Sequence, residues 1–242
     1  SKRLRDLVGE AGMAVDLRLS FEELESLAFA ASHDLLEPLR KIRGFSELLA
    51  EHCDGRLDEE SGRYIGLIVD GAVRMQELID GLLQYSRAGR GELRRVPVDM
   101  NRALESALSD LEFALKDSGA QAAADPLPTL PADPALVESV FRNLVGNALK
   151  FRGKELPRVH VGARRRGGEW EFAVRDNGIG IHPRDYDKLF RPFQRLHSRK
   201  EYPGTGIGLA LCRKIMDKHG GRIWVESEPG RGTTFRFTLP AQ

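Results

Sequence analysis

A helical repeat occupies roughly the first fifty residues and restricts the fold of this chain more than any other feature. Apolar residues recur there at alternating steps of three and four, the spacing of helices that pack along a shared seam. Ser20 is a good N-cap with Glu23 three residues on, so we expect a strong helix from Ser20 to about His52. The apolar stripe consists of Leu7, Ala14, Leu17, Phe21, Leu24, Ala28, Ala31, Leu35, Pro38, Ile42, Phe45 and Leu49.

His33 lies off this stripe, at the heptad position that points furthest from the seam. A histidine there is solvated, and the neighbouring carboxylate of Asp34 can fix one ring tautomer and leave the other nitrogen as a nucleophile. On an isolated helix, the ordinary interpretation of such a pair is a solvated surface contact. Pro38 lies inside the helical pattern and predicts a looser or kinked helix just after His33.

A second amphipathic helix is expected after the turn at residues 53–56, and it should run to about Arg87. Two antiparallel helices cannot bury both apolar stripes by themselves, whereas two hairpins from two chains can form a four-helix bundle. The pattern therefore predicts a homodimer. The second stripe consists of Tyr64, Ile68, Gly71, Met75, Leu78, Leu82 and Tyr85.

Length and composition limit the classes of function. A chain of 242 residues has room for two domains, and 41% hydrophobic with 30% charged residues is typical of a globular protein without a membrane span. The 37 basic and 36 acidic residues give a net charge of +1, which argues against nucleic-acid binding. Cys53 and Cys212 lie far apart and fit a cytoplasmic setting. Because the chain begins at Ser1 inside a helical repeat, we expect a fragment that follows an upstream sensor.

The pattern changes to mixed strands and helices near Leu93. We therefore divide the chain into a linker helix over 1–19, a helical hairpin domain over 20–90 and a second domain over 93–242. In the second domain we expect strands at 96–98, 120–124, 158–165, 170–175, 221–227 and 233–239. Helices are expected at 101–117, 134–151 and 207–219, with a proline-rich loop at 126–134.

The expected helix over 134–151 carries polar side chains at helical spacing. Asn143 and Asn147 are four residues apart and share one face, and Lys150 lies one step further. Amide oxygens can bind Mg²⁺, and an ammonium group can meet phosphate. A plain polar helix face is the alternative, but asparagine is a poor helix former and suggests a use.

Two glycine-rich segments follow. Asp176 ends a strand and can accept a hydrogen bond from an exocyclic amine such as that of adenine, while Gly178 and Gly180 allow the backbone to approach a flat ligand. The second segment opens a helix and suits phosphates, although its pattern alone is weak and its context does not fit a Rossmann site. Its glycines are Gly204, Gly206 and Gly208.

The segment between the glycine loops places apolar anchors beside cations. Phe190 and Phe193 alternate with Lys188, Arg191 and Arg195. The phenylalanines fit a core position equally well, but we expect them to hinge a mobile lid that brings Arg195 near the phosphates.

With these segments taken together, residues 20–240 resemble the transmitter module of a bacterial two-component sensor histidine kinase, of the phytochrome- or PAS-linked type. The stretch around His33 is similar to the family's H box, and residues 143–151 are similar to its N box. Residues 176–181, 188–193 and 204–209 resemble the G1, F and G2 boxes, in the family's order.

The resemblance implies an α+β protein: a helical hairpin that forms a four-helix bundle in the dimer, followed by an α/β sandwich that binds ATP, of the histidine kinase, gyrase and chaperone type. It implies that His33 accepts the phosphoryl group with Asp34 as its acid/base partner, and that the group then passes to an aspartate of a response regulator. Asn147 with Asn143 would hold Mg²⁺, Lys150 would contact phosphate and Asp176 would bind adenine. Gly178, Gly180, Gly204, Gly206 and Gly208 would shape the pocket and its lid.

One position departs from the family pattern. Many members have Thr or Asn four residues after the histidine, whereas this chain has Glu37, so phosphatase activity does not follow from the resemblance. The rival functions are an ATPase of the gyrase, chaperone and mismatch-repair group, a non-enzymatic dimeric scaffold, and a module acting mostly as a phosphatase. Surface or loop roles are expected for the remaining histidines, which are His52, His160, His182, His197 and His219.

Overall fold

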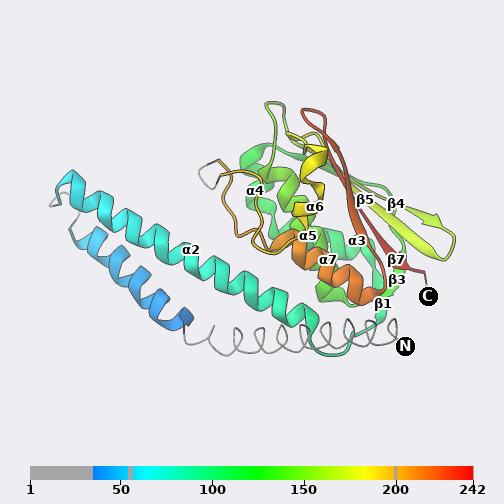
Figure 1. The fold of residues 1–242 in the computed structure, drawn as a ribbon, viewed down its shortest axis with the longest axis horizontal. Helices are drawn as coiled ribbons and strands as arrows, with labels where there is room; N and C mark the ends of the chain where they lie inside the picture. The colour runs from blue at the N-terminus through cyan, green and yellow to red at the C-terminus, as the bar shows by residue number, and fades with distance from the viewer. Residues whose placement is uncertain (1–34, 54–56, 199–200, 242) are drawn as a thin grey trace, which may run out of the picture. The chain divides into compact units, whose positions relative to one another are not determined.

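Residues 35–53, 57–198 and 201–241 are described by the structure, a computed structural model. The chain separates into two compact units, residues 1–86 and 87–242. Helices dominate the first unit and a mixed sheet with helices forms the second, which confirms the predicted α+β class (Figure 1). Ser20, His33, Asp34 and the predicted linker helix lie outside the described residues.

The first unit is a helical hairpin. One helix covers residues 35–52, and α2 covers Glu59–Gly89 after a turn that begins at Cys53. Asp58 caps α2, because its Oδ1 accepts a hydrogen bond of 2.8 Å from the Ser61 amide. Arg43 Nη1 joins the two helices by donating to Gln76 Oε1 at 3.2 Å. In the described residues no helix has both the length and the apolar composition that crossing a bilayer requires.

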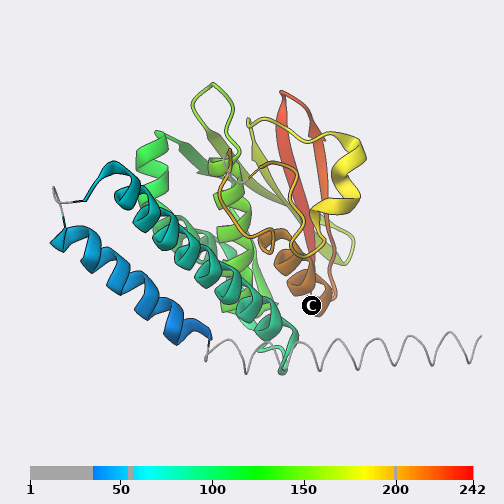
Figure 2. The same cartoon turned by 60° about the vertical axis from the view of Figure 1, so that its left-hand side comes forward.

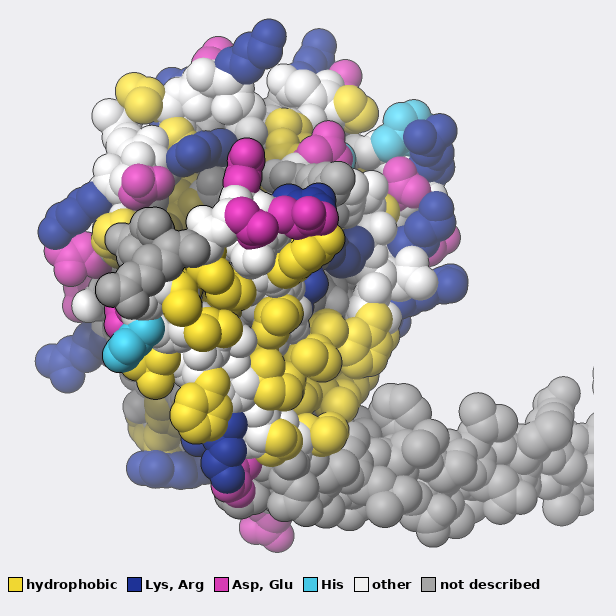
Figure 3. Space-filling view, turned by 90° about the vertical axis from the view of Figure 1, so that its left-hand side faces the viewer, with side chains coloured by type: hydrophobic (Ala, Val, Ile, Leu, Met, Phe, Trp, Pro, Cys, Tyr) yellow, Lys and Arg dark blue, Asp and Glu magenta, His cyan; other side chains and the backbone are white. Residues whose placement is uncertain are grey.

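Much of the predicted apolar stripe is open to solvent in the single chain. Phe45 is 69% exposed and Ile68 on α2 is 49% exposed. Figure 3 shows apolar side chains gathered on this face of the hairpin. The hairpin thus presents an apolar surface that its own two helices do not cover, here called the hairpin face. Its exposed apolar residues are Leu35, Ile42, Phe45, Leu48, Leu49, Leu57, Tyr64, Leu67, Ile68 and Met75.

A five-stranded mixed sheet forms the frame of the second unit. Its strands run in the order β2 (Gln121–Ala124), β4 (Arg158–Arg166), β5 (Glu169–Asp176), β7 (Gly232–Pro240), β6 (Ile223–Glu228). Only β2 and β4 are parallel neighbours in it. The helices α3 (Met100–Asp110), α4 (Glu112–Ser118), α5 (Pro134–Lys150) and α7 (Gly208–His219) lie on one side of the sheet (Figures 1 and 2).

The core lies between α5 and the sheet, and three aromatic rings form its centre. Phe172 on β5 and Phe237 on β7 are cross-strand partners with stacked rings, 4.8 Å apart. Phe141 on α5 meets both edge-on, at 6.3 Å and 5.8 Å. All three are fully buried, so they fix how α5 sits on the sheet.

The opposite face of the sheet carries a buried ion cluster. Because side chains alternate along a strand, Glu171 points away from the helix side that Phe172 occupies. Its side chain is 3% exposed and is surrounded by three guanidinium groups: Arg164 at 2.6 Å, Arg236 at 2.9 Å and Arg166 at 3.3 Å. Burial raises the pKa of Glu171, but the hydrogen bond from Arg164 and the three positive charges outweigh it and hold the pKa below its usual value.

Two sequence predictions need correction. The expected loop at 126–134 contains the strand β3 (Thr129–Ala132), which pairs with β1 (Val96–Asp99) and places Pro131 opposite Pro97. Proline argued against a strand because it cannot donate to a ladder, but each strand of a two-stranded ribbon has a free edge that tolerates it. The expected helix over 101–117 is interrupted at Leu111, between α3 and α4.

His219 is also not the surface residue that the sequence predicted. It is 1% exposed, its Nδ1 donates to the Ile215 carbonyl at 2.8 Å, and its Nε2 accepts from the Asp133 amide at 3.1 Å. Burial lowers the pKa of His219, so the ring stays neutral in this place. The histidine therefore ties the end of α7 to the N-cap of α5.

Lys218, the residue before His219, binds the start of the second unit through hydrogen bonds. Lys218 Nζ donates to the carbonyl oxygens of Ala88 at 3.1 Å and Arg90 at 2.8 Å. Arg95 Nη2 donates to the His219 carbonyl at 3.3 Å. Residues 88–90, at the start of the second unit, are thereby attached to the end of α7.

Candidate functional site

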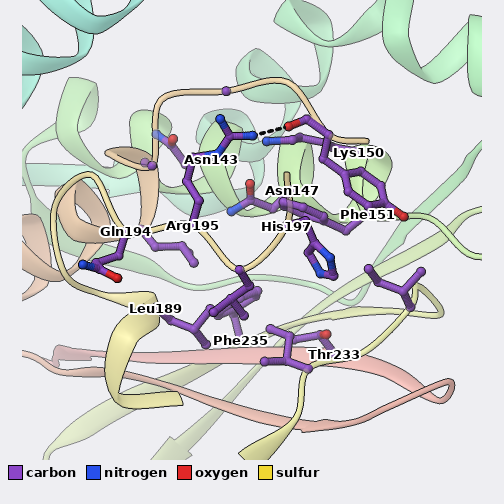
Figure 4. Close-up of a pocket in the computed structure, with 18 of the residues that line it drawn as sticks. Asn143, Asn147, Lys150, Phe151, Leu189, Gln194, Arg195, His197, Thr233 and Phe235 are labelled. Carbon is purple, nitrogen blue, oxygen red and sulfur yellow. Dashed lines mark hydrogen bonds between the residues drawn. The ribbon is translucent and has the colours of Figure 1, made fainter. Parts of the chain in front are cut away.

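A cavity of about 270 Å³ lies where the end of α5, the loop after β5 and the start of α7 meet (Figure 4). The segment 193–206 and α6 (Tyr186–Leu189) contribute further walls. Most of the binding residues predicted from the sequence line this cavity. They are Asn143, Asn147, Lys150, Asp176, Gly180, Arg195, Gly204, Gly206 and Gly208.

The polar face of α5 turns into the cavity because of how the helix starts and packs. Asp133 caps it by accepting from the Leu136 amide, and Pro134 takes its first position, as predicted. Asn143 Nδ2 donates to the Ser139 carbonyl at 2.8 Å. A side chain on Gly208 would collide with Asn143 Oδ1, so this oxygen faces the start of α7. Asn147 lies one turn further along the same face, as Figure 4 shows.

Asp176 provides a buried hydrogen-bond acceptor. Its Oδ1 accepts from the Gly178 amide at 2.8 Å and from the Thr233 amide at 3.2 Å. None of the described residues donates to its Oδ2. Burial raises the pKa of this carboxyl to about 6, and the two amide hydrogen bonds only partly oppose the rise. The side chain is therefore ready to accept a hydrogen bond from a ligand in the cavity.

The loop after Asp176 is pressed against the end of α5. The Ile179 amide donates to the Phe151 carbonyl at 3.0 Å, and a side chain on Gly178 would collide with that carbonyl. Gly178 does not line the cavity itself. Its function in the structure is to let the loop approach α5 closely enough to form the cavity wall.

The segment over 193–206 closes on itself beside the cavity. Phe193 takes a left-handed conformation with φ of 62°, unusual for a bulky residue, and its amide donates to the Gly206 carbonyl at 3.0 Å. The Arg195 guanidinium donates to the Tyr202 carbonyl at 2.6 Å (Figure 4). An ideal Cβ on Gly204 would lie 2.6 Å from Lys150 Nζ, so the missing side chain makes room for this ammonium.

Phe190 is half-buried and does not line the cavity, and neither does Phe193, whereas Arg195 does. The sequence prediction also missed the apolar walls and several polar ones. Their residue types look like ordinary core or loop residues, and only their positions beside the glycine segments could have indicated them. The missed lining residues are Phe151, Ile179, Ile181, Lys188, Leu189, Gln194, Leu196, His197, Tyr202, Thr205, Leu209, Thr233 and Phe235.

The predicted nucleophile pair, His33 and Asp34, lies outside the described residues, so no geometry is given for it. Glu37, four residues after His33 in the sequence, is described. Its carboxylate forms an exposed ion pair of 2.7 Å with Lys41.

The fold and the cavity together define a class. Residues 132–242 match the family "Histidine kinase-, DNA gyrase B-, and HSP90-like ATPase", and residues 24–91 match "His Kinase A (phospho-acceptor) domain". The second unit is thus an ATP-binding domain of this group, and it follows a phosphoacceptor domain.

Relatives narrow the class. The chain is 45% identical over 230 residues to cyanobacterial phytochrome A of Nostoc sp. and 39% identical over 237 residues to the phytochrome-like protein Cph1 of Synechocystis sp.. The solved structure of full-length ShkA in complex with AMPPNP is similar to this chain, with a TM-score of 0.68 and 27% sequence identity. The match covers 89% of this chain and 45% of the ShkA chain. The chain belongs to the sensor histidine kinases and is a transmitter module of that family.

The two phytochrome matches cover 95% and 98% of this chain. The chain spans only 30% and 32% of the length of these relatives.

Proposed function

We propose that this chain is an ATP-dependent protein-histidine kinase that phosphorylates its own His33. One observation carries the proposal: a single cavity brings together a buried acceptor, Asp176, with two cations, Lys150 and Arg195, from separate segments of the chain. Asp176 can accept a hydrogen bond from a base with an exocyclic amine, and Lys150 and Arg195 can bind a polyphosphate chain.

The cavity residues divide the recognition of ATP between them. Asp176 accepts a hydrogen bond from the adenine amine, and Ile179 and Leu189 offer apolar contact to the base. Lys150 and Arg195 neutralise phosphate charge, and the amides at the start of α7 add the positive end of a helix of 12 residues. In the reaction a ring nitrogen of His33 attacks the γ-phosphorus and ADP leaves, with catalysis mainly by positioning and charge neutralisation.

Mg²⁺ fits this donor set as a companion of the nucleotide. In the described part of the chain no group of three or more His, Cys, Asp or Glu could hold a metal ion by itself. Mg²⁺ is commonly bound by one or two protein oxygens together with phosphates and water. The amide oxygens of Asn143 and Asn147 at the cavity would supply the protein share, and the ion would neutralise phosphate charge when bound.

Phosphate transfer to a partner completes the proposed function. The phosphoramidate at His33 would pass to an aspartate of a response-regulator receiver domain, as the family's two-component pattern implies. An upstream phytochrome- or PAS-like sensor would control the reaction in the full-length protein, and a cytoplasmic location would suit this chemistry. Phosphatase activity is not part of the proposal, because Glu37 occupies the position four residues after the histidine.

The hairpin face supports a homodimer. Two copies of the hairpin would bury the exposed apolar residues of both in a four-helix bundle.

Labelling with γ-labelled ATP and Mg²⁺ tests the kinase. We expect label on the protein that is labile in acid and stable in alkali, and we expect His33→Gln to abolish it. His52→Gln is the matched control, because His52 is an exposed histidine of the first unit whose Nδ1 contacts the Leu48 carbonyl. Phosphate release without label, unchanged in His33→Gln, would instead identify an ATPase; neither label nor release would favour a scaffold.

A further inference from the structure

Three aromatic rings that line the cavity contact one another. Phe151 follows α5, and its ring lies 4.9 Å from the Tyr202 ring and 5.9 Å from the His197 ring. His197 and Tyr202 also contact each other edge-on at 5.2 Å. Aromatic pairs at these distances attract each other beyond ordinary apolar burial. The rings therefore join the segment 193–206 to the end of α5.

The Phe151 ring also contacts a cation of the cavity. Lys150 Nζ lies 4.6 Å from the centre of this ring, within the range of a cation–π contact. The same ammonium occupies the space beside Gly204 that a side chain would fill. The Phe151 ring thus contacts Lys150 and also the rings of His197 and Tyr202, so the positions of these side chains depend on each other.

The second cation is attached to the same cluster. Arg195 Nη2 donates to the backbone carbonyl of Tyr202 at 2.6 Å. Because the Tyr202 ring packs against Phe151, the position of the Tyr202 carbonyl is restricted. The Arg195 guanidinium group that donates to this carbonyl is restricted with it. The rings are half-buried and line the cavity, so they do not belong to the core around Phe141.

We propose that Phe151, His197 and Tyr202 form an aromatic clamp that positions Lys150 and Arg195 for the phosphates of the nucleotide. The clamp deepens the proposed function and rests on it. Its members are positioning residues, because they act through the two cations. It predicts that loss of a ring weakens the binding of phosphates and leaves the binding of the base unchanged.

Calorimetric titration with two probes separates these effects. AMPPNP with Mg²⁺ carries base and phosphates, whereas adenosine carries no phosphate. For Tyr202→Ala we expect AMPPNP affinity to fall about tenfold, since the change removes ring contacts with two neighbours, and adenosine affinity to stay within about twofold. The bond from Arg195 goes to the backbone of residue 202, so this substitution tests the ring alone.

Two further variants sharpen the test. Tyr202→Phe keeps the ring, and we expect it to restore most of the lost AMPPNP affinity. Phe113→Ala is the control for removing an aromatic ring elsewhere in the same unit, because Phe113 on α4 is 84% exposed and lies outside the cavity. His197→Ala should reproduce the pattern of Tyr202→Ala with a smaller loss.

The outcomes are distinct. Wild-type AMPPNP affinity in Tyr202→Ala would overturn the clamp, and so would an equal loss for adenosine, which would indicate a collapsed cavity. Failure of Tyr202→Phe to restore binding would overturn it as well, because the hydroxyl group and not the ring would then matter. A wild-type protein that binds no AMPPNP would overturn the proposed function itself.

Discussion

Asp176 combines a binding group with a cost to the folded state. The carboxylate is buried in the cavity wall, and its pKa of about 6 means that burial disfavours its charged form. Such a group is retained where a ligand needs its charge, and its desolvation is a known cost of binding sites.

The pH dependence of stability follows from the sign of this shift. The pKa is about 6 in the folded protein and 3.8 in a free side chain, so the folded state binds the proton more tightly. The stability that this group contributes is therefore complete below about pH 3.8 and is lost as the pH rises through 6. A shift of this size corresponds to up to about 3 kcal/mol.

Asp176→Asn should remove that loss. The amide keeps an Oδ1 that can accept from Gly178 and Thr233 but does not titrate. We expect the stability of the nucleotide-free variant, relative to that of the wild type, to rise by about 2 kcal/mol from pH 4.5 to pH 7.5. Urea unfolding of both proteins at the two pH values measures this. A difference that does not change with pH would contradict the assignment.

The cavity illustrates which residues a sequence can reveal. Asn143, Asp176 and Gly208 were predicted because a polar residue in mid-helix, a carboxylate after a strand and a glycine at a helix start each need a reason. Phe151 and Tyr202 were not predicted, because an aromatic residue in a helix or loop usually belongs to the core. Only the path of the segment over 193–206 brings these two rings together.

At the scale of the element, β5 separates two environments. Its one side packs Phe172 into the aromatic core, and its other side holds Glu171 among three arginines. The alternation of the strand was readable in the sequence, and β4 and β5 lie where it predicted them. The partners of Glu171 were not readable, since Arg236 lies 65 residues away on β7 and meets it only in the assembled sheet.

Glu171→Gln should therefore destabilise the second unit. The change leaves three guanidinium groups without their shared carboxylate, and we expect a loss of about 1–3 kcal/mol, because two of the arginines are more than half exposed and are screened by water. Urea unfolding at pH 7 measures the loss. Glu155→Gln is the matched control, because Glu155 forms an exposed pair with Arg158 and should cost less than about 1 kcal/mol.

The contribution of Glu171 to stability depends on pH with the opposite sign to that of Asp176. The pKa of Glu171 lies below its usual 4.5, so its contribution is complete above that value and is lost as the pH falls through the lower pKa of the folded state. The difference between wild type and Glu171→Gln should shrink in acid. A difference that grows in acid would contradict the cluster.

At the scale of the molecule, the hairpin face is the surface on which the proposed dimer depends. The heptad pattern predicted most of its residues, and the exposure of Phe45 and Ile68 in the single chain follows from that pattern. Leu48, Leu57 and Leu67 are exposed there as well but were not part of the predicted stripes. The proline-containing strand β3 and the buried position of His219 could not be predicted from the sequence, because both depend on partners distant in the chain.

Phe45→Glu should separate the proposed dimer. A carboxylate at the centre of an apolar bundle loses its hydration, and we expect the dissociation constant to rise at least about thirtyfold. Light scattering after size-exclusion chromatography across a dilution series measures it. Phe113→Glu, at an 84% exposed position in the other unit, should leave association unchanged. A monomeric wild type would refute the dimer.

The contact of Lys218 has a practical consequence for anyone who isolates the second unit. The two carbonyl groups that this lysine binds belong to Ala88 and Arg90, and the boundary between the compact units lies between Ser86 and Arg87, inside α2. A fragment that begins at residue 93 would lack both acceptors and leave the ammonium group at the end of α7 without them. A fragment that begins at residue 87 would keep both hydrogen bonds of Lys218.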